Sequence, residues 1–412
     1  MSFLDDFRTM STFGATPGGG VERQAASAAD GETRRWFGGW LAEQGFRVEV
    51  DAIGNIFGLL ELVPGAPYVL VGSHLDSQPL AGRFDGAYGV LAGAHAARSV
   101  RDRAAAEGAT PRFNVAVVDW FNEEGSRFKP SMMGSAVHIG RLPLETALAT
   151  TDPRGVSVAD ALDAIGGRGE FTGLDVSAYA EIHVEQGREL EATGTTIGLV
   201  ASTWTAQKLE VVVTGEQAHT GAAPMADRRD ALFGAAKLIV AVRELIDGFE
   251  VEQLHTAVSE MYLDPNSPVA LAREVRMLVD IRSPRQDLLE TAVARLRTTI
   301  GSIAAEARVE IDIVDVVEWS SGPFLEAGVL LAGEEAARLG YSHRRSATVA
   351  GHDATNLKEV VPTVMLFVPS VDGISHNERE FTSDDDLLAG LDVLQSVLYR
   401  LCAGELETER TS

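Results

Sequence analysis

The stretch VGSHLDSQPLAGRFDG, from Val71 to Gly86, begins as a buried strand and becomes polar within a few residues. It continues the apolar run APYVL and then brings His74, Asp76 and Asp85 close together in the sequence. In open α/β sheets, ligands bind where strands reach their carboxyl ends. A histidine and two carboxylates at such a point predict a functional site at the end of this strand.

The same pattern follows three further apolar runs, which are compact enough to be strands covered on both faces. The runs are FNVAVVDWF (113–121), AYAEIHV (178–184) and PTVMLFVP (362–369). The polar residues at or after their ends are Asn122, Glu123 and Glu124 for the first, His183, Glu185 and Gln186 for the second, and His376 and Glu378 for the third. Four strand ends that each carry candidate metal ligands make chance a poor explanation.

The chain has 412 residues, which is too long for one ordinary hydrophobic core. Strand-like and helix-like segments alternate through most of it, and this pattern is typical of the α/β class. We therefore predict a large domain with a mixed, mostly parallel sheet, made of residues 1–206 and 318–412. The four strand ends all fall within this domain.

The middle of the chain, residues 207–317, has a different order of elements. The pattern predicts strand, helix, strand, strand, helix and strand, at 208–215, 227–248, 253–263, 273–284, 285–307 and 308–316. This β-α-β-β-α-β order is that of a ferredoxin-like unit. We expect it to form a smaller domain inserted into the larger one.

Composition excludes several classes of function. Lys and Arg number 35 and Asp and Glu 60, so the formal net charge is −25, which repels nucleic acids and anionic membranes. The single cysteine, Cys402, excludes an internal disulfide and fits a reducing compartment. No apolar run approaches the roughly 20 residues of a membrane helix, and the start MSFLDDFRTM does not resemble a signal peptide. We expect a cytoplasmic protein that binds neither nucleic acid nor membrane.

The candidate ligands are histidines and carboxylates without thiolates, a set that suits zinc, manganese, cobalt or nickel. They are His74, Asp85, Glu124, His183 and His376. If one carboxylate bridges, five ligands can hold two ions with three ligands each. Asp76 can then orient His74 from behind. One of the two paired glutamates, Glu123 or Glu124, must stay off the metal to move protons.

Eight motifs, spread in order over nearly the whole chain, resemble those of the hydantoinase/carbamoylase amidases. The motifs are GSHLDS, GRFDGAYGVLAG, FNEEGSRF, EIHVEQG, QAHTGAAPM, DIRSP, AGHDA and GISHNEREFT. This family belongs to the co-catalytic metallopeptidase clan and includes N-carbamoyl-L-amino-acid hydrolases, β-ureidopropionases and allantoate amidohydrolases. His183 stands where the clan's peptidases often carry a carboxylate, and this histidine is typical of the amidases.

The resemblance implies two divalent ions in each subunit, foremost zinc, with manganese, cobalt or nickel as alternatives. In the family pattern, His74 and His183 bind one ion, Glu124 and His376 bind the other, and Asp85 bridges them. Glu123 is then the general base and acid, with the reverse assignment of the two glutamates as the alternative. Asp76 is implied to orient His74, while His352 in AGHDA is assigned no metal.

The resemblance also implies a set of substrate contacts, namely Gln186, His219, Asn266, Arg282 and Gly351. Arg282 offers a guanidinium fork that suits a carboxylate. His219 is expected to reach across a homodimer and support the oxyanion. The inserted domain would then serve as a lid and dimerisation domain that closes over the site.

The reaction implied is hydrolysis of the carbamoyl C–N bond of an N-carbamoyl (ureido) amino acid, which yields amino acid, ammonia and carbon dioxide. Allantoate or a related ureide is an alternative substrate, as is an acylated amino acid or dipeptide. His183 and the EQG segment that follows it argue against peptidase activity. A metal-loaded binding protein without turnover is a further alternative, which the complete set of ligands and Glu123 disfavours.

Overall fold

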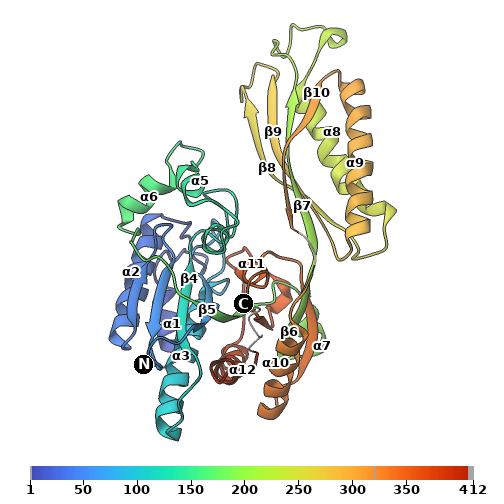
Figure 1. Ribbon diagram of the computed structural model, residues 1–412. Helices are drawn as coiled ribbons and strands as arrows, with labels where there is room; N and C mark the ends of the chain where they lie inside the picture. Colours follow the sequence, from blue (N-terminus) through green and yellow to red (C-terminus); the bar gives the residue numbers. More distant parts are fainter. Residues whose placement is uncertain (1, 320–321, 407–412) are drawn as a thin grey trace. The chain divides into compact units, whose positions relative to one another are not determined.

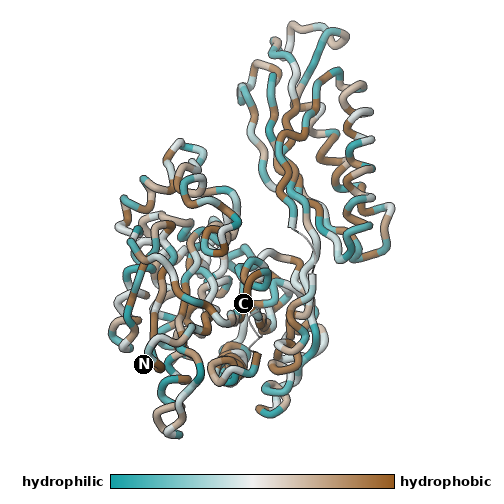
Figure 2. The backbone as a smooth tube through the Cα atoms, viewed as in Figure 1, coloured by the Kyte–Doolittle hydropathy of each residue, from teal (hydrophilic) through white to brown (hydrophobic). Residues whose placement is uncertain are grey.

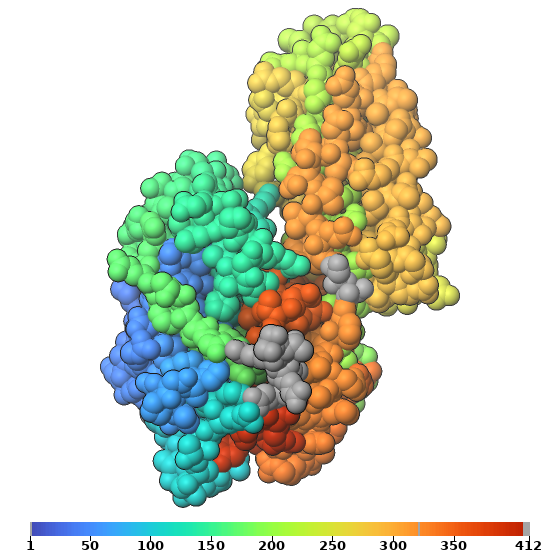
Figure 3. All heavy atoms as spheres, in the orientation of Figure 1, coloured from blue at the N-terminus to red at the C-terminus, as the bar shows by residue number. Residues whose placement is uncertain are grey.

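The computed structural model describes residues 2–319 and 322–406, which form two compact units. The larger unit comprises Met1–Ala201 and Phe324–Ser412, and the smaller unit comprises Ser202–Pro323. Parts of the chain that are far apart in sequence, coloured blue to green and orange to red in Figure 3, therefore build the same unit. The smaller unit is an insertion between them.

The larger unit contains strands and helices from both parts of the chain. Its strands are β1 (Arg47–Val50), β2 (Ile56–Leu60), β3 (Tyr68–His74), β4 (Asn114–Trp120), β5 (Val176–Val184), β6 (Ile197–Thr203), β12 (His343–Thr348) and β13 (Thr363–Val368). Its helices are α1 (Phe3–Met10), α2 (Ala28–Glu43), α3 (Ala87–Glu107), α4 (Met133–His138), α5 (Leu144–Ala149), α6 (Val158–Ile165), α7 (Glu189–Thr193), α10 (Glu326–Leu339), α11 (Asp353–Leu357), η3 (Val371–Gly373) and α12 (Asp384–Cys402).

The large sheet is mixed, as the sequence predicted, and within the described residues it has nine strands. Their order is β1-β2-β4-β3-β5-β13-β6-β11, with β11 (Gly322–Pro323) and β12 both paired to β6. The neighbours β4, β3, β5 and β13 pair in parallel, whereas β1, β2, β6 and β11 pair antiparallel toward the edges. The four strands whose ends carry the candidate ligands are therefore parallel neighbours.

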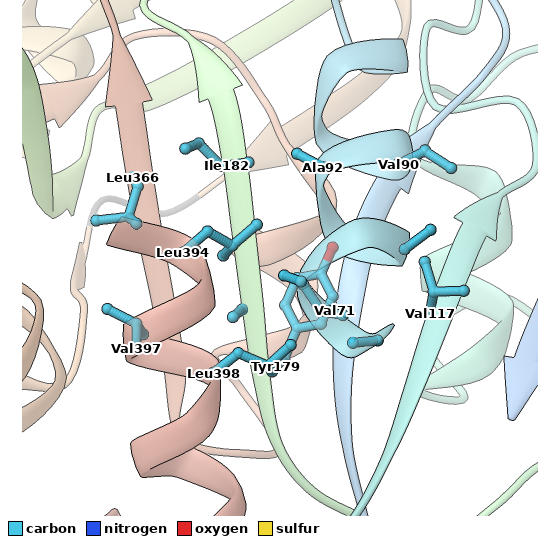
Figure 4. Packing of buried hydrophobic residues seen from close by; sticks show 14 of the residues in the cluster. Val71, Val90, Ala92, Val117, Tyr179, Ile182, Leu366, Leu394, Val397 and Leu398 are labelled. Carbon is cyan, nitrogen blue, oxygen red and sulfur yellow. The ribbon is translucent and has the colours of Figure 1, made fainter. Parts of the chain in front are cut away.

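The core of the larger unit lies between the central strands and the helices that cover them. Every residue of β2, β4 and β13 is buried, as expected for strands covered on both faces. In Figure 4, side chains of α3 and α12 meet those of the sheet, among them Val71, Ile182 and Leu394. This packing fixes the strands, and the strands in turn fix the residues at their ends.

The smaller unit has the predicted β-α-β-β-α-β order. Its elements are β7 (Thr205–Thr214), η1 (Met225–Asp227), α8 (Ala231–Glu244), η2 (Leu245–Gly248), β8 (His255–Asp264), β9 (Glu274–Ser283), α9 (Gln286–Ala307) and β10 (Glu310–Trp319). The sheet order is β10-β7-β9-β8 with antiparallel pairing throughout, and Figure 1 shows α8 and α9 on one face. Hydrophobic and hydrophilic residues alternate along the strands, since one face packs on the helices (Figure 2).

The division between the units falls slightly outside the limits that the sequence suggested. Residues 202–206 and 318–323, assigned above to the larger domain, belong to the smaller unit. The reason is strand continuity, because β7 and β10 pair as far as Ala206 and Trp319. Separately, none of the helices in the described residues combines the length and apolar character needed to cross a membrane.

Candidate metal centre

The carboxyl ends of four parallel strands meet at one edge of the large sheet. His74 is the last residue of β3 and His183 the last but one of β5. The pair Glu123 and Glu124 follows β4, and His376 lies beyond β13, after the short helix η3. The sheet order therefore explains how residues from four distant parts of the sequence come together.

His74, Asp85 and His183 form the first group of candidate ligands, with their ligand atoms all within 4.8 Å of one another. The Asp85 Oδ1 atom lies 3.4 Å from His74 Nε2 and 3.0 Å from His183 Nε2. All three side chains are buried. This group is an enclosed cluster of two imidazoles and one carboxylate.

Asp85, Glu124 and His376 form a second group, again within 4.8 Å. His376 Nε2 lies 3.3 Å from Asp85 Oδ2 and 3.4 Å from Glu124 Oε2. The His376 side chain is 47% exposed, so this group opens to solvent. Asp85 thus turns one oxygen to each group, which is the arrangement expected of a bridging carboxylate.

Backbone carbonyls orient the two buried histidines. His74 Nδ1 lies 3.0 Å from the carbonyl oxygen of Asp76, and His183 Nδ1 lies 2.8 Å from that of Val184. A carbonyl only accepts, so each Nδ1 donates and each Nε2 faces Asp85. Gly86 has a φ of +62°, and a Cβ there would lie 2.3 Å from the His74 ring, so glycine is required at this position.

The electrostatics of the centre favour a positive charge. Burial lowers the pKa of His74, but the carboxylates of Glu123, Asp85 and Asp76 outweigh it and raise this pKa well above its usual value. Burial also lowers the pKa of His376, but the carboxylates of Glu124 and Asp85 outweigh this effect and raise the pKa to about 9. Carboxylates that surround inward-facing imidazole nitrogens in this way are a donor set suited to divalent cations. The residues therefore fit the expected metal.

Glu123 lies beside the first group without joining either one. Its Oε2 atom is 3.5 Å from His74 Nε2, and its side chain is 8% exposed. Burial raises the pKa of Glu123 well above its ordinary value, and the nearby carboxyls of Asp353, Glu124 and Asp76 raise it further. A carboxyl with a raised pKa next to a metal site is suited to accept and return a proton.

Asp76 makes contacts that differ from the expected ones. Its carboxylate accepts hydrogen bonds from the backbone N–H groups of Glu123, at 3.1 Å, and Glu124, at 3.3 Å. The carboxylate is 3.7 Å from His74 Nδ1, which instead donates to the Asp76 carbonyl. Asp76 therefore orients His74 through its main chain and fixes the two glutamates through its side chain.

Three residues at the centre have left-handed backbone conformations, which are unfavourable for residues other than glycine. They are Asn122 (φ +53°), Gln186 (φ +57°) and His376 (φ +53°). Each lies in the loop that follows one of the ligand-bearing strands. Strained backbone of this kind is concentrated at functional sites, where the surrounding structure maintains it.

Two of the predicted substrate contacts also lie at this edge. Gln186 Nε2 donates to Asp85 Oδ2 at 2.8 Å, so its side chain contacts the carboxylate that both groups share. Gly351 packs beside Met132 and precedes His352, whose ring centroid is 4.5 Å from that of His183. The AGHDA loop therefore packs directly against the first group.

The other three predicted contacts belong to the smaller unit. His219 is exposed, and its Nδ1 accepts from the N–H groups of Gly221 and Ala222 at 3.0 and 3.2 Å, so the ring hydrogen lies on Nε2. Arg282 donates from Nε and Nη2 to both oxygens of Asp280, at 2.9 and 2.7 Å. Asn266 is exposed in the loop between β8 and β9.

Sequence reasoning missed several polar residues that support the centre, and Gln78 and Glu181 are two of them. Gln78 donates from Nε2 to Glu124 Oε2 at 3.0 Å, and it follows Asp76 by only two positions. Glu181 is fully buried, and it accepts from Ser73 Oγ at 2.7 Å and from Ala354 N at 2.8 Å. An acid inside the apolar run AYAEIHV was the available signal, because buried carboxylates need partners.

Comparison with known proteins agrees with this geometry. The model of peptidase family M20/M25/M40 matches residues 70–400. A protein of Mycolicibacterium smegmatis described as a hydrolase is 56% identical over 98% of this chain and 94% of its own. The N-carbamoyl-L-amino-acid amidohydrolase of Rhizobium meliloti is 38% identical over 95% of this chain and 93% of its own. The crystal structure of a hydantoinase/carbamoylase family amidase from Burkholderia vietnamiensis is 38% identical, covers 97% of each chain and has a TM-score of 0.91.

The chain belongs to peptidase family M20/M25/M40. Within that family it is an amidohydrolase of the hydantoinase/carbamoylase group, as its motifs predicted. The fold class, a large mixed sheet with a separate antiparallel sheet, is that of the Burkholderia vietnamiensis amidase and is confirmed.

Proposed function

We propose that this amidohydrolase cleaves the carbamoyl C–N bond of N-carbamoyl amino acids at a centre of two divalent ions. The observation that carries the proposal is Asp85, whose two oxygens face two separate groups of ligands, with Glu123 alongside. His74 and His183 would hold one ion with Asp85, and Glu124 and His376 would hold the other. Zinc is the first candidate, with manganese, cobalt and nickel as alternatives.

The chain's own residues then account for the reaction. Divalent ions at such a centre lower the pKa of water and polarise a carbonyl oxygen. Glu123 takes a proton from the attacking water. The Asp76 carboxylate holds Glu123 in place by accepting a hydrogen bond from the Glu123 backbone N–H. Glu123 returns that proton to the leaving nitrogen, so the amino acid is released and the carbamoyl carbon leaves as carbon dioxide with ammonia.

Residues of the smaller unit would bind and polarise the substrate. Nε2–H of His219 is a suitable donor to the developing oxyanion, because its Nδ1 already accepts two hydrogen bonds. Arg282, held as a rigid fork by Asp280, would bind the substrate carboxylate, and Asn266 would add a further contact. Gln186 and the Gly351 loop of the larger unit would complete the set.

We further propose that the protein is a homodimer in which His219 serves the partner's site, with the smaller unit as lid and dimerisation domain. The exposed edge strand β8 supports this assignment, because it presents Met261 and Tyr262 at 41% and 49% exposure. Light scattering during gel filtration gives the mass in solution, and a single-chain mass of 43.9 kDa would exclude the dimer.

The test of the reaction is release of ammonia by purified protein reloaded with manganese, cobalt or zinc. N-carbamoyl-L-methionine, N-carbamoyl-β-alanine and allantoate are offered side by side. We expect turnover of a carbamoyl amino acid that a chelator abolishes and added metal restores. Turnover of allantoate alone would move the assignment to the ureide branch, to which the 31% identical allantoate amidohydrolase of Bacillus subtilis belongs by name.

A protein that binds two ions yet is inactive on all three compounds would contradict the carbamoyl assignment. Acylated amino acids and dipeptides would then be tested, as substrates of the same clan. A protein with no metal and no turnover would overturn the proposal as a whole.

A further inference from the structure

Glu380 is a buried acid, 4% exposed, that lies four residues beyond His376 and that the mechanism above does not use. Its Oε1 atom accepts hydrogen bonds from the backbone N–H groups of Phe84 and Asp85, both at 3.0 Å. The carboxyl group lies over Gly82, where a Cβ would be 2.3 Å from Oε1. Glu380 therefore joins the segment that carries His376 to the loop that carries Asp85.

Ser375 makes a second connection between the same two segments. Its Oγ lies 2.9 Å from Glu380 Oε2 and 3.0 Å from Asp85 Oδ2. Glu380 thus acts on Asp85 at both ends, on the backbone directly and on the carboxylate through Ser375. Asp85 is the one residue that both groups of ligands share, so its rotation affects the spacing of all the others.

The contacts of Ser375 concern one oxygen of Asp85 only. Oδ1 faces His74 and His183, whose positions β3 and β5 fix, whereas Oδ2 faces His376, which lies in a loop. From these contacts we propose that Glu380 and Ser375 are positioning residues that set Asp85 Oδ2 for the ion held with Glu124 and His376. The inference rests on the proposed function, because it requires the second ion.

Two substitutions at Glu380 separate positioning from charge. In Glu380→Gln, the amide oxygen still accepts from Phe84 and Asp85. The bond to Ser375 reverses direction, because Ser375 Oγ donates to Glu380 Oε2 whereas an amide nitrogen there would donate to Ser375 Oγ. Glu380→Ala loses every one of these contacts. Loss of a residue that supports metal ligands typically costs 10- to 100-fold in metal affinity. We expect that loss in the alanine variant and close to wild-type binding in the glutamine variant.

The experiment is calorimetric titration of the chelator-treated protein with manganese alone, and then with zinc alone, which needs no substrate. The wild type should bind two ions. Glu380→Ala should bind the first with unchanged affinity and the second about 10- to 100-fold more weakly. Ser375→Ala, which removes only a hydroxyl, should weaken the second ion by about 10-fold and keeps the test available if the alanine variant at 380 does not fold.

A matched control is Glu335→Ala, which removes another buried acid of the same unit. Glu335 forms ion pairs with Arg338 and Arg400 and does not contact the metal centre. It should bind both ions as the wild type does. Normal binding of the second ion by Glu380→Ala or Ser375→Ala overturns the inference while leaving the proposed function intact. A wild type that binds fewer than two ions overturns the two-ion centre, and the inference with it.

Discussion

The larger unit buries histidines whose pKa values move in opposite directions, although burial lowers the pKa in each case. Burial, and then the Arg98 guanidinium, lower the pKa of His95 to about 4, although Asp6 faces its Nε2 at 3.1 Å. At the metal centre burial is just as complete, yet the pKa of His74 is raised well above its usual value. The difference is the number of carboxylates around the ring, since several surround His74.

This comparison separates a histidine of the hydrophobic core from those of the candidate metal centre. His95 contacts one carboxylate and packs against Phe3 and Trp40, so it is a neutral ring in the core beneath α1. The metal centre contains more carboxylates than its two buried histidines, His74 and His183, require as hydrogen-bond partners. Such an excess of buried negative charge is stable only when a cation or protons compensate it.

The largest expected effect comes from Asp85→Ala, which removes the carboxylate shared by both groups. We expect loss of both ions and of all turnover, a larger cost than the ~10- to 100-fold typical of residues that only support ligands. Metal content after gel filtration, measured by atomic emission, checks this. Asp6→Asn removes the carboxylate at His95 and should leave the metal content unchanged, so equal metal loss in both variants would contradict the comparison.

Glu123→Gln should separate proton transfer from metal binding. Glu123 stays 3.5 Å from His74 and belongs to neither ligand group, so the variant should keep its metal. It should lose at least ~10²-fold in kcat, the usual scale for a missing general base. Steady-state ammonia release and metal content are measured on the same sample.

The alternative assignment of the two glutamates is tested by the parallel variant Glu124→Gln. Because Glu124 Oε2 lies 3.4 Å from His376 Nε2, this change should weaken metal binding. Near wild-type turnover of Glu123→Gln, together with a metal-replete but inactive Glu124→Gln, would reverse the two roles.

Removing one histidine from each group should sharpen the contrast between the enclosed and the open side of the centre. His376→Ala should lose one ion at little cost in stability, because its side chain is half exposed. His183→Ala should lose the other ion and also destabilise the metal-free protein by ~2–5 kcal/mol, the range for large buried side chains. Urea unfolding with chelator present measures the second effect, and equal destabilisation by both variants would contradict it.

The convergence of the ligands could be predicted from sequence because strand direction determines it. Compact apolar runs that end in His74, Glu123 and His183 indicate parallel strands, whose carboxyl ends meet at one edge. The β-α-β-β-α-β order of the smaller unit was equally readable from the periodicity. The boundaries between the units were harder to predict from sequence, since β7 and β10 continue to pair beyond the expected limits of the smaller domain.

The contacts that tune the centre could not be predicted, because they depend on loop conformation. Nothing in the spacing shows that the Asp76 carboxylate accepts from Glu123 and Glu124, or that Glu380 reaches the backbone of Asp85. These contacts join residues 47 and 295 positions apart. The sequence also does not reveal that His95 and His74 differ in pKa, since that requires knowing which side chains surround each ring.

The smallest expected effect concerns His95 and the dependence of stability on pH. Folding lowers the pKa of His95 from the ordinary 6.5 to about 4, so at pH values between these two the unfolded chain binds a proton at His95 more readily than the folded protein does. Stability from this residue is therefore present above pH 6.5 and is lost as the pH falls toward 4. Between pH 7 and pH 5 the loss is ~2 kcal/mol.

His95→Gln should remove this part of the pH dependence, because glutamine does not titrate. Urea unfolding of both proteins at pH 7 and pH 5 measures it, with both stripped of metal so that metal release does not contribute. The wild type should lose ~2 kcal/mol more than the variant over this interval. If both lose the same amount, then His95 takes up its proton in the folded core as easily as in the unfolded chain. In that case burial beside Arg98 would not distinguish it from the histidines of the metal centre.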